Sequence, residues 1–123
     1  MKTPDITEAE WEVMTVLWQR SPLTANQIIA ELQHHTGWAP TTVRTLLDRL
    51  ARKKIVRAAR RDSAITFQPL ATKDECVSHE SENFLRRVFN GATQPLLLHF
   101  TKKARLTPAE IKELQRILKE KGQ

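Results

Sequence analysis

The residues with the most evident chemistry lie between positions 41 and 71. This segment holds eight basic and two acidic residues, so its net charge of +6 equals that of the whole chain. Guanidinium groups and hydroxyls are the donors that bind phosphates and base edges in nucleic acids. The charge alone also fits a solvated protein face, since Lys and Arg lie mostly on surfaces. The candidate DNA-binding residues are Thr41, Thr42, Arg44, Thr45, Arg49, Arg52, Arg60 and Arg61.

Other reactive side chains form no catalytic or metal-binding motif. Cys76 and His79 have a C-x-x-H spacing, but two ligands do not fill a tetrahedral zinc site. The chain has three glycines and no glycine-rich phosphate loop, and no Ser, His and Asp arrangement indicates nucleophilic catalysis. We therefore expect no enzyme activity, no cofactor and no metal site.

Three short amphipathic helices are predicted to position the candidate residues. Capping boxes that begin at Thr7 and Thr24 open the first two, which end near Pro22 and Gly37. The third helix begins near Pro40 and places its Thr and Arg side chains opposite a one-sided apolar stripe. This pattern favours a helix-turn-helix, and the alternative is a three-helix bundle with a charged third helix. The stripe consists of Val43, Leu46, Leu47 and Leu50.

Residues 55–60 and 65–70 predict two short strands joined by a polar turn at 61–64. Three helices followed by a hairpin with basic residues near its tip is the order of elements in a winged helix. In that fold the third helix enters the major groove while the hairpin, or wing, approaches the phosphate backbone. We expect base-edge contacts from Thr41, Thr42, Arg44 and Thr45, and phosphate contacts from Arg49, Arg52, Arg60 and Arg61.

The remaining residues predict further helices with apolar faces. Capping boxes begin at Thr72 and Thr107, and Thr93 is a candidate cap between them. A segment of this size has few elements to cover its own apolar residues, so burial against a second copy is favoured over folding back on the winged helix. The fold class is thus mainly α with a small β-hairpin: a winged-helix DNA-binding domain at 1–71 and a helical dimerisation domain at 72–123. The candidate dimerisation residues are Phe84, Leu85, Val88, Leu97, Phe100, Ile111, Leu114 and Leu118.

The sequence composition indicates in which cellular compartment the protein acts. No apolar run approaches the roughly 18 residues of a membrane span. The first residues show no apolar leader segment, and one cysteine excludes an intramolecular disulfide framework. We expect a cytoplasmic protein with no membrane partner.

Several motifs in this order resemble the BlaI/MecI penicillinase-repressor family, which also includes the copper-responsive CopY repressors. The resemblance covers nearly the whole chain. The matching stretches are AEWEVM at 9–14, TANQI at 24–28, PTTVRTLLDRL at 40–50, FLRRVFNG at 84–91, LLLHF at 96–100 and LTPAEIKEL at 106–114.

The resemblance implies a dimeric repressor that binds inverted-repeat operator DNA through an N-terminal winged helix. In the β-lactam-responsive members, cleavage of an Asn–Phe bond, linked to a membrane sensor protease, inactivates the repressor. The equivalent bond here joins His99 to Phe100, so the family's Asn is replaced. The chain also lacks the C-terminal cysteine cluster of the copper-responsive members. The inferred function is therefore a homodimeric repressor with a sensor protease as a candidate partner, and the alternative is a winged-helix module that binds protein without sequence-specific DNA binding.

Overall fold

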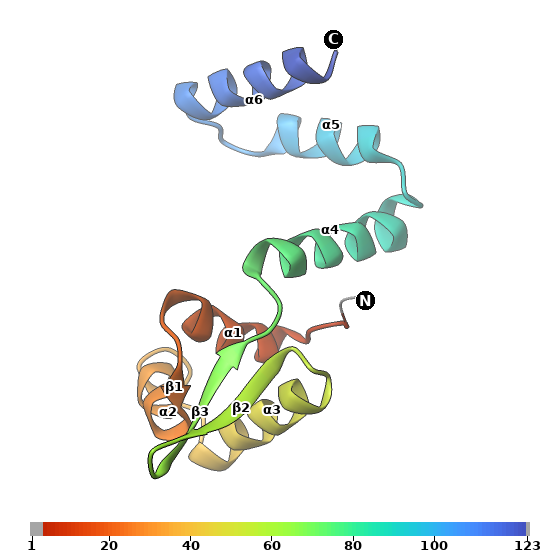
Figure 1. The fold of residues 1–123 in the computed structure, drawn as a ribbon. Helices are drawn as coiled ribbons and strands as arrows, with labels where there is room; N and C mark the ends of the chain where they lie inside the picture. The colour runs from red at the N-terminus through yellow and green to blue at the C-terminus, as the bar shows by residue number, and fades with distance from the viewer. Residues whose placement is uncertain (1–3, 123) are drawn as a thin grey trace. The chain divides into compact units, whose positions relative to one another are not determined.

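The computed structural model describes residues 4–122 and consists of helices with one small sheet (Figure 1). Residues 1–3, on which part of the leader prediction falls, lie outside the described residues. The elements in order are α1 (Glu8–Gln19), β1 (Leu23–Thr24), α2 (Ala25–Gln33), α3 (Pro40–Arg52), β2 (Val56–Arg61), β3 (Ala64–Pro69), α4 (Lys73–Phe89), α5 (Thr93–Lys103) and α6 (Pro108–Lys121).

Helix starts follow the capping chemistry of the sequence. Thr7, Thr24 and Thr107 each accept a hydrogen bond from the backbone N–H three residues on, and the Glu or Gln there accepts one in return. Thr72 makes the same reciprocal pair at the start of α4. The prediction that Thr93 caps its helix is wrong: Ala92 is the N-cap residue and Thr93 is the first helical residue.

The apolar stripes of α1, α2 and α3 meet in one core. The stripe predicted for α3 is buried along its whole length, so the winged-helix arrangement is confirmed. Ile55 and Val56 at the start of the hairpin are buried in the same core. The largest fully buried apolar side chains from the three helices are Met14, Leu17, Ile28, Leu32, Leu47 and Leu50.

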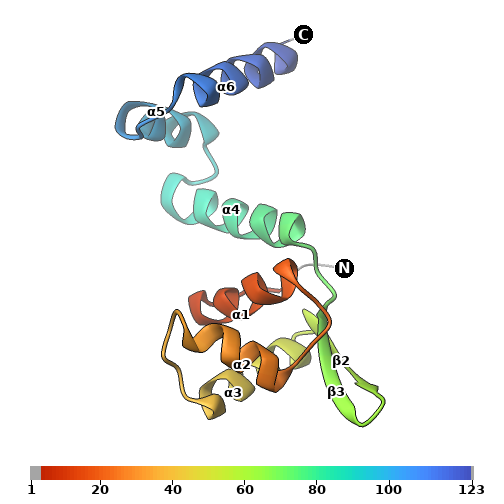
Figure 2. The same cartoon turned by 90° about the vertical axis from the view of Figure 1, so that its left-hand side faces the viewer.

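The predicted hairpin forms, with Arg61 paired to Ala64 beside the turn and Val56 paired to Pro69 at its base. Asp62 adopts a φ of 55° in the turn, which lets two residues reverse the chain. A short strand, β1, pairs with β3 and completes a three-stranded antiparallel sheet of order β1-β3-β2. The hairpin extends away from the helices that precede it (Figure 2).

The chain divides into two compact units, an N-terminal unit that ends at Ser81 and a C-terminal unit that begins at Glu82. The first turns of α4 belong to the N-terminal unit because the side chain of Cys76 is fully buried in its core. The sequence-based boundary after Ala71 lies where the winged-helix elements end, and there the Ala71 carbonyl accepts a hydrogen bond from Trp18 Nε1 at 3.0 Å. No helix in the described part of the chain is long and apolar enough to cross a membrane.

A buried ion pair joins the end of α3 to the start of α1. Lys53 Nζ lies 2.6 Å from Oε1 of Glu10, whose side chain is fully buried, and 3.1 Å from the Asp5 carbonyl. Burial by itself raises the pKa of Glu10, but the hydrogen bonds from Lys53 and Thr7 outweigh burial and hold that pKa below its ordinary value. Removal of one partner from a buried pair leaves an uncompensated charge.

We therefore expect Lys53→Met to lower the free energy of unfolding by about 2 kcal/mol at neutral pH, less than for a fully buried pair because part of the lysine contacts water. Since the pKa of Glu10 is lowered in the folded chain, the pair stabilises above the unfolded pKa and is lost as pH falls through the folded value. The difference from wild type should shrink in the acid range around and below pH 4.5. Urea unfolding at neutral pH and in this acid range measures the free energy of unfolding of each variant. Lys73→Met, which changes an exposed lysine, is the control. An equal loss of stability in the two variants would contradict the role of the ion pair.

Candidate nucleic-acid interface

The candidate DNA-binding side chains are all exposed and come from two neighbouring elements of the N-terminal unit. Six lie on α3 and two, Arg60 and Arg61, lie at the end of β2 next to the hairpin turn. The basic segment at residues 41–71 also contains Lys53, which forms an ion pair with Glu10 and so differs from the exposed arginines around it. The structure thus places the sequence-predicted residues on one exposed helix face and one hairpin tip.

Burial of one face of α3 determines what the other face presents. Because Val43, Leu46, Leu47 and Leu50 are buried, the helical period turns Thr41, Thr45 and Arg52 outward. The Thr45 hydroxyl donates to the Thr41 carbonyl at 2.9 Å, so its oxygen still offers lone pairs outward. This face can therefore donate through guanidinium groups and accept through hydroxyls, which suits the edges of bases in a major groove.

Arg44 has a protein partner that the sequence analysis did not identify. Its Nη2 lies 2.9 Å from Oδ1 of Asn26, in the first turn of α2, and both residues are exposed. The hydrogen bond restricts the rotamers of Arg44 and so reduces the entropy cost of presenting its remaining donors. In the sequence, Asn26 is recognisable only as part of a capping box. Because it lies 18 residues from Arg44, no local pattern indicates that the two side chains are in contact.

The hairpin presents its arginines on both faces of the strand. Arg60 pairs with Ile65 and Arg61 with Ala64, so their side chains leave opposite faces of β2 close to the turn. Arg57, which the sequence analysis did not assign, is exposed on the same strand face as Arg61. Arg57 and Arg61 thus place two guanidinium groups on one face of the strand, where they can neutralise phosphates.

The Cys76 and His79 pair does not form a common site. Cys76 is fully buried, and burial followed by the negative charges of Glu75 and Glu80 raises the pKa of its thiol, which stays protonated. His79 instead contacts Asp5, with Nε2 2.7 Å from Oδ1. Among the described residues, Cys76 belongs to no group of side chains that could hold a metal ion.

The C-terminal unit leaves large apolar side chains in contact with solvent. Leu85 is half-buried, and the other predicted dimerisation residues are exposed, from 36% for Phe84 to 61% for Leu118. Helices α5 and α6 enclose an open groove of about 460 Å³ between Leu97 and Phe100 on one helix and Leu114 and Leu118 on the other. His99 lies beside Phe100 inside α5, with their ring centres 5.4 Å apart. Large exposed apolar patches occur at protein contacts, membrane contacts and ligand grooves.

Comparison with known proteins gives a consistent result. A family model described as penicillinase repressor matches residues 6–120. The methicillin resistance regulatory protein MecI of Staphylococcus aureus strain N315 is 36% identical over 120 residues, 98% of each chain. The penicillinase repressor of Bacillus licheniformis is 34% identical over 97% of this chain and 93% of the relative. The solution structure of the Bacillus licheniformis BlaI monomeric form in complex with the blaP half-operator matches with a TM-score of 0.55 and 32% identity, covering 60% of this chain and 90% of that one.

The hairpin assignment leads to a prediction about salt. If Arg61 neutralises one phosphate, Arg61→Ala should reduce the slope of log K against log salt by about 0.9 on non-specific duplex DNA. Fluorescence anisotropy between low and physiological salt measures the slope. Arg20→Ala is the matched control, because it removes the same charge from the end of α1 and should leave the slope unchanged. An unchanged slope for Arg61→Ala would show that Arg61 does not contact the backbone.

Proposed function

The chain belongs to the penicillinase repressor family of DNA-binding transcriptional repressors, which are not enzymes, and from this premise we propose that two copies bind an inverted-repeat operator together. The observation that carries the proposal is the exposed Thr and Arg face of α3, in a unit similar to a BlaI structure whose monomer holds a half-operator. A repressor must reach the chromosome, so we place its action in the cytoplasm.

The proposed readout divides the interface between bases and phosphates. Arg44, oriented by Asn26, has a planar fork of donors that suits the two acceptors of a guanine. The threonines of the first turns of α3 lie on the same exposed helix and reach neighbouring positions. The arginines at the end of α3 and at the hairpin tip bind the backbone and so fix the register. The base-reading set is Thr41, Thr42, Arg44 and Thr45, and the phosphate-binding set is Arg49, Arg52, Arg60 and Arg61.

Pairing of two chains is proposed through the C-terminal segment, residues 72–123. Its apolar side chains are exposed in a single chain and form a groove between α5 and α6 that a second copy can fill. A two-fold dimer presents two recognition helices in opposite directions, which is why its operator is an inverted repeat.

Release of the operator is proposed to follow a cut between His99 and Phe100, made through a sensor protease. Both residues are exposed, and the bond lies within α5, so a cut would divide that helix. Leu97 and Phe100, which line the same groove, would then lie on two separate fragments. Neither piece retains enough apolar surface to hold the pair of chains, and the two half-sites would no longer be bound together.

The operator model is tested with DNA from upstream of the chain's own gene. We expect specific binding with a Kd in the range of about 10⁻⁸–10⁻¹¹ M, against roughly 10⁻⁴–10⁻⁶ M for a scrambled duplex. Leu118→Glu should make the chain sediment as a monomer and move operator binding toward the weaker range while a single half-site is bound as before. Lys112→Glu, which changes charge on the other side of α6, is the control and should remain dimeric. Equal binding of operator and scrambled DNA by the wild type would instead favour the protein-binding alternative.

The release mechanism predicts a defined product. When cells that carry this repressor and its sensor are exposed to a β-lactam, mass spectrometry should find a fragment that ends at His99, whereas an untreated culture should contain the intact chain. The physical reason is that the cut removes α6 and half of the groove from the DNA-binding unit. Derepression with the chain still intact would contradict this mechanism and point to a bound ligand.

A further inference from the structure

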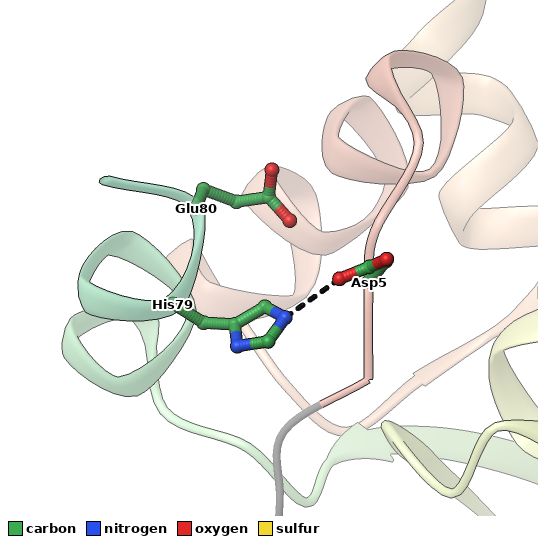
Figure 3. A group of neighbouring side chains, drawn as sticks. All are labelled: Asp5, His79 and Glu80. Carbon is green, nitrogen blue, oxygen red and sulfur yellow. Dashed lines mark hydrogen bonds and ion pairs between the residues drawn. The ribbon is translucent and has the colours of Figure 1, made fainter. Parts of the chain in front are cut away.

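Three side chains that are distant in sequence meet beside the start of α1. Asp5 precedes that helix, and His79 and Glu80 lie on α4, as Figure 3 shows. One ligand atom from each of them lies within 4.8 Å of the others. We propose that these residues form a binding site for a divalent transition-metal ion of the zinc class.

The three ligand atoms need only small movements to hold such an ion. Donor atoms around a tetrahedral zinc lie roughly 3.3 Å apart, given metal–ligand bonds of about 2.0–2.1 Å. His79 Nε2 and Asp5 Oδ1 are 2.7 Å apart, so these two atoms would move slightly apart as the ion replaces their hydrogen bond. The remaining adjustment is to bring the Glu80 carboxylate inward, and a water molecule can supply the fourth ligand.

The ligands are held by their surroundings. The His79 side chain is only 13% exposed, and Glu80 is half-buried. The Ile6 backbone N–H donates to Glu80 Oε1 at 3.3 Å, and Ile6 is part of the core. A fixed donor on a ligating carboxylate is the kind of outer-shell support that orients metal ligands. The side chain of Asp5 is 82% exposed, which leaves the ion a path from solvent.

The ligand set discriminates among metals. One imidazole with two carboxylates suits zinc and similar transition metals, whereas magnesium and calcium prefer oxygen ligands alone. The two carboxylates carry the charge that a divalent ion neutralises. Lys53 contacts the Asp5 carbonyl, but its charge is compensated by Glu10 at 2.6 Å.

A bound ion would tie the segment before α1 to the first half of α4. The two segments are 74 residues apart, so the site exists only when the N-terminal unit is folded. An ion that binds only the folded unit stabilises it by mass action. If no ion binds, the contact between His79 and Asp5 joins the two segments as a hydrogen bond, and titration with metal distinguishes the two cases.

Zinc titration of the full-length chain, freed of metal by a chelator, tests the proposal. We expect calorimetry to find one zinc ion bound per chain and a melting temperature raised by several degrees, with no such rise for magnesium. His79→Ala, Asp5→Asn and Glu80→Gln should each lower zinc affinity by roughly ten- to a hundredfold or more, since loss of an outer-shell partner already costs that much.

His35→Ala is the matched control, because His35 is exposed beyond the end of α2 and should not affect binding. Circular dichroism establishes that each variant is folded before titration, and the two carboxylate variants nearly preserve side-chain shape. Zinc affinity unchanged in His79→Ala, or lost in His35→Ala alone, would overturn the proposal. Absence of zinc binding by the wild type would overturn it as well.

Discussion

Burial of the apolar face of α3 is the constraint on which the rest of the molecule depends. Four aliphatic side chains of that face are packed into the core, so the helix cannot rotate without exposing them. Each buried aliphatic side chain contributes about 1.5–3 kcal/mol relative to exposure, which makes such a rotation costly. The outward direction of the Thr and Arg side chains is therefore a consequence of core packing. The same packing places Ile55 and Val56, where the hairpin begins, and so sets where its arginines can reach.

The two units differ in how far they bury their large apolar side chains. The N-terminal unit encloses its large aliphatic residues among three helices and a sheet. In the C-terminal unit, α5 and α6 have no buried residue, and most of their large apolar side chains face solvent in a single chain. In the proposed dimer, this arrangement would assign assembly to one half of the sequence and DNA contact to the other. A change in the proposed assembly state would then alter DNA binding without any change in the DNA-contacting residues.

Local sequence signals predicted most of the elements and the exposed site. Capping boxes, the period of the apolar residues and the charge of the hairpin are local, and each is visible within a few residues. Strand β1 escaped prediction because two residues form a strand only when β3 lies beside them. The contacts of Arg44 with Asn26 and of Lys53 with Glu10 depend on how helices pack, which no short stretch of sequence specifies. The same holds for His79, whose spacing pointed to Cys76 although its contact is with Asp5.

The buried position of Cys76 has a consequence for observing the molecule in motion. The chain holds one thiol, which lies in the core of the N-terminal unit and stays protonated because burial raises its pKa. A thiol in that state reacts slowly, so alkylation requires that α4 first separate from the core. The alkylation rate of Cys76 therefore reports how often α4 separates from the core, and it can be measured in the unmodified protein without an introduced probe.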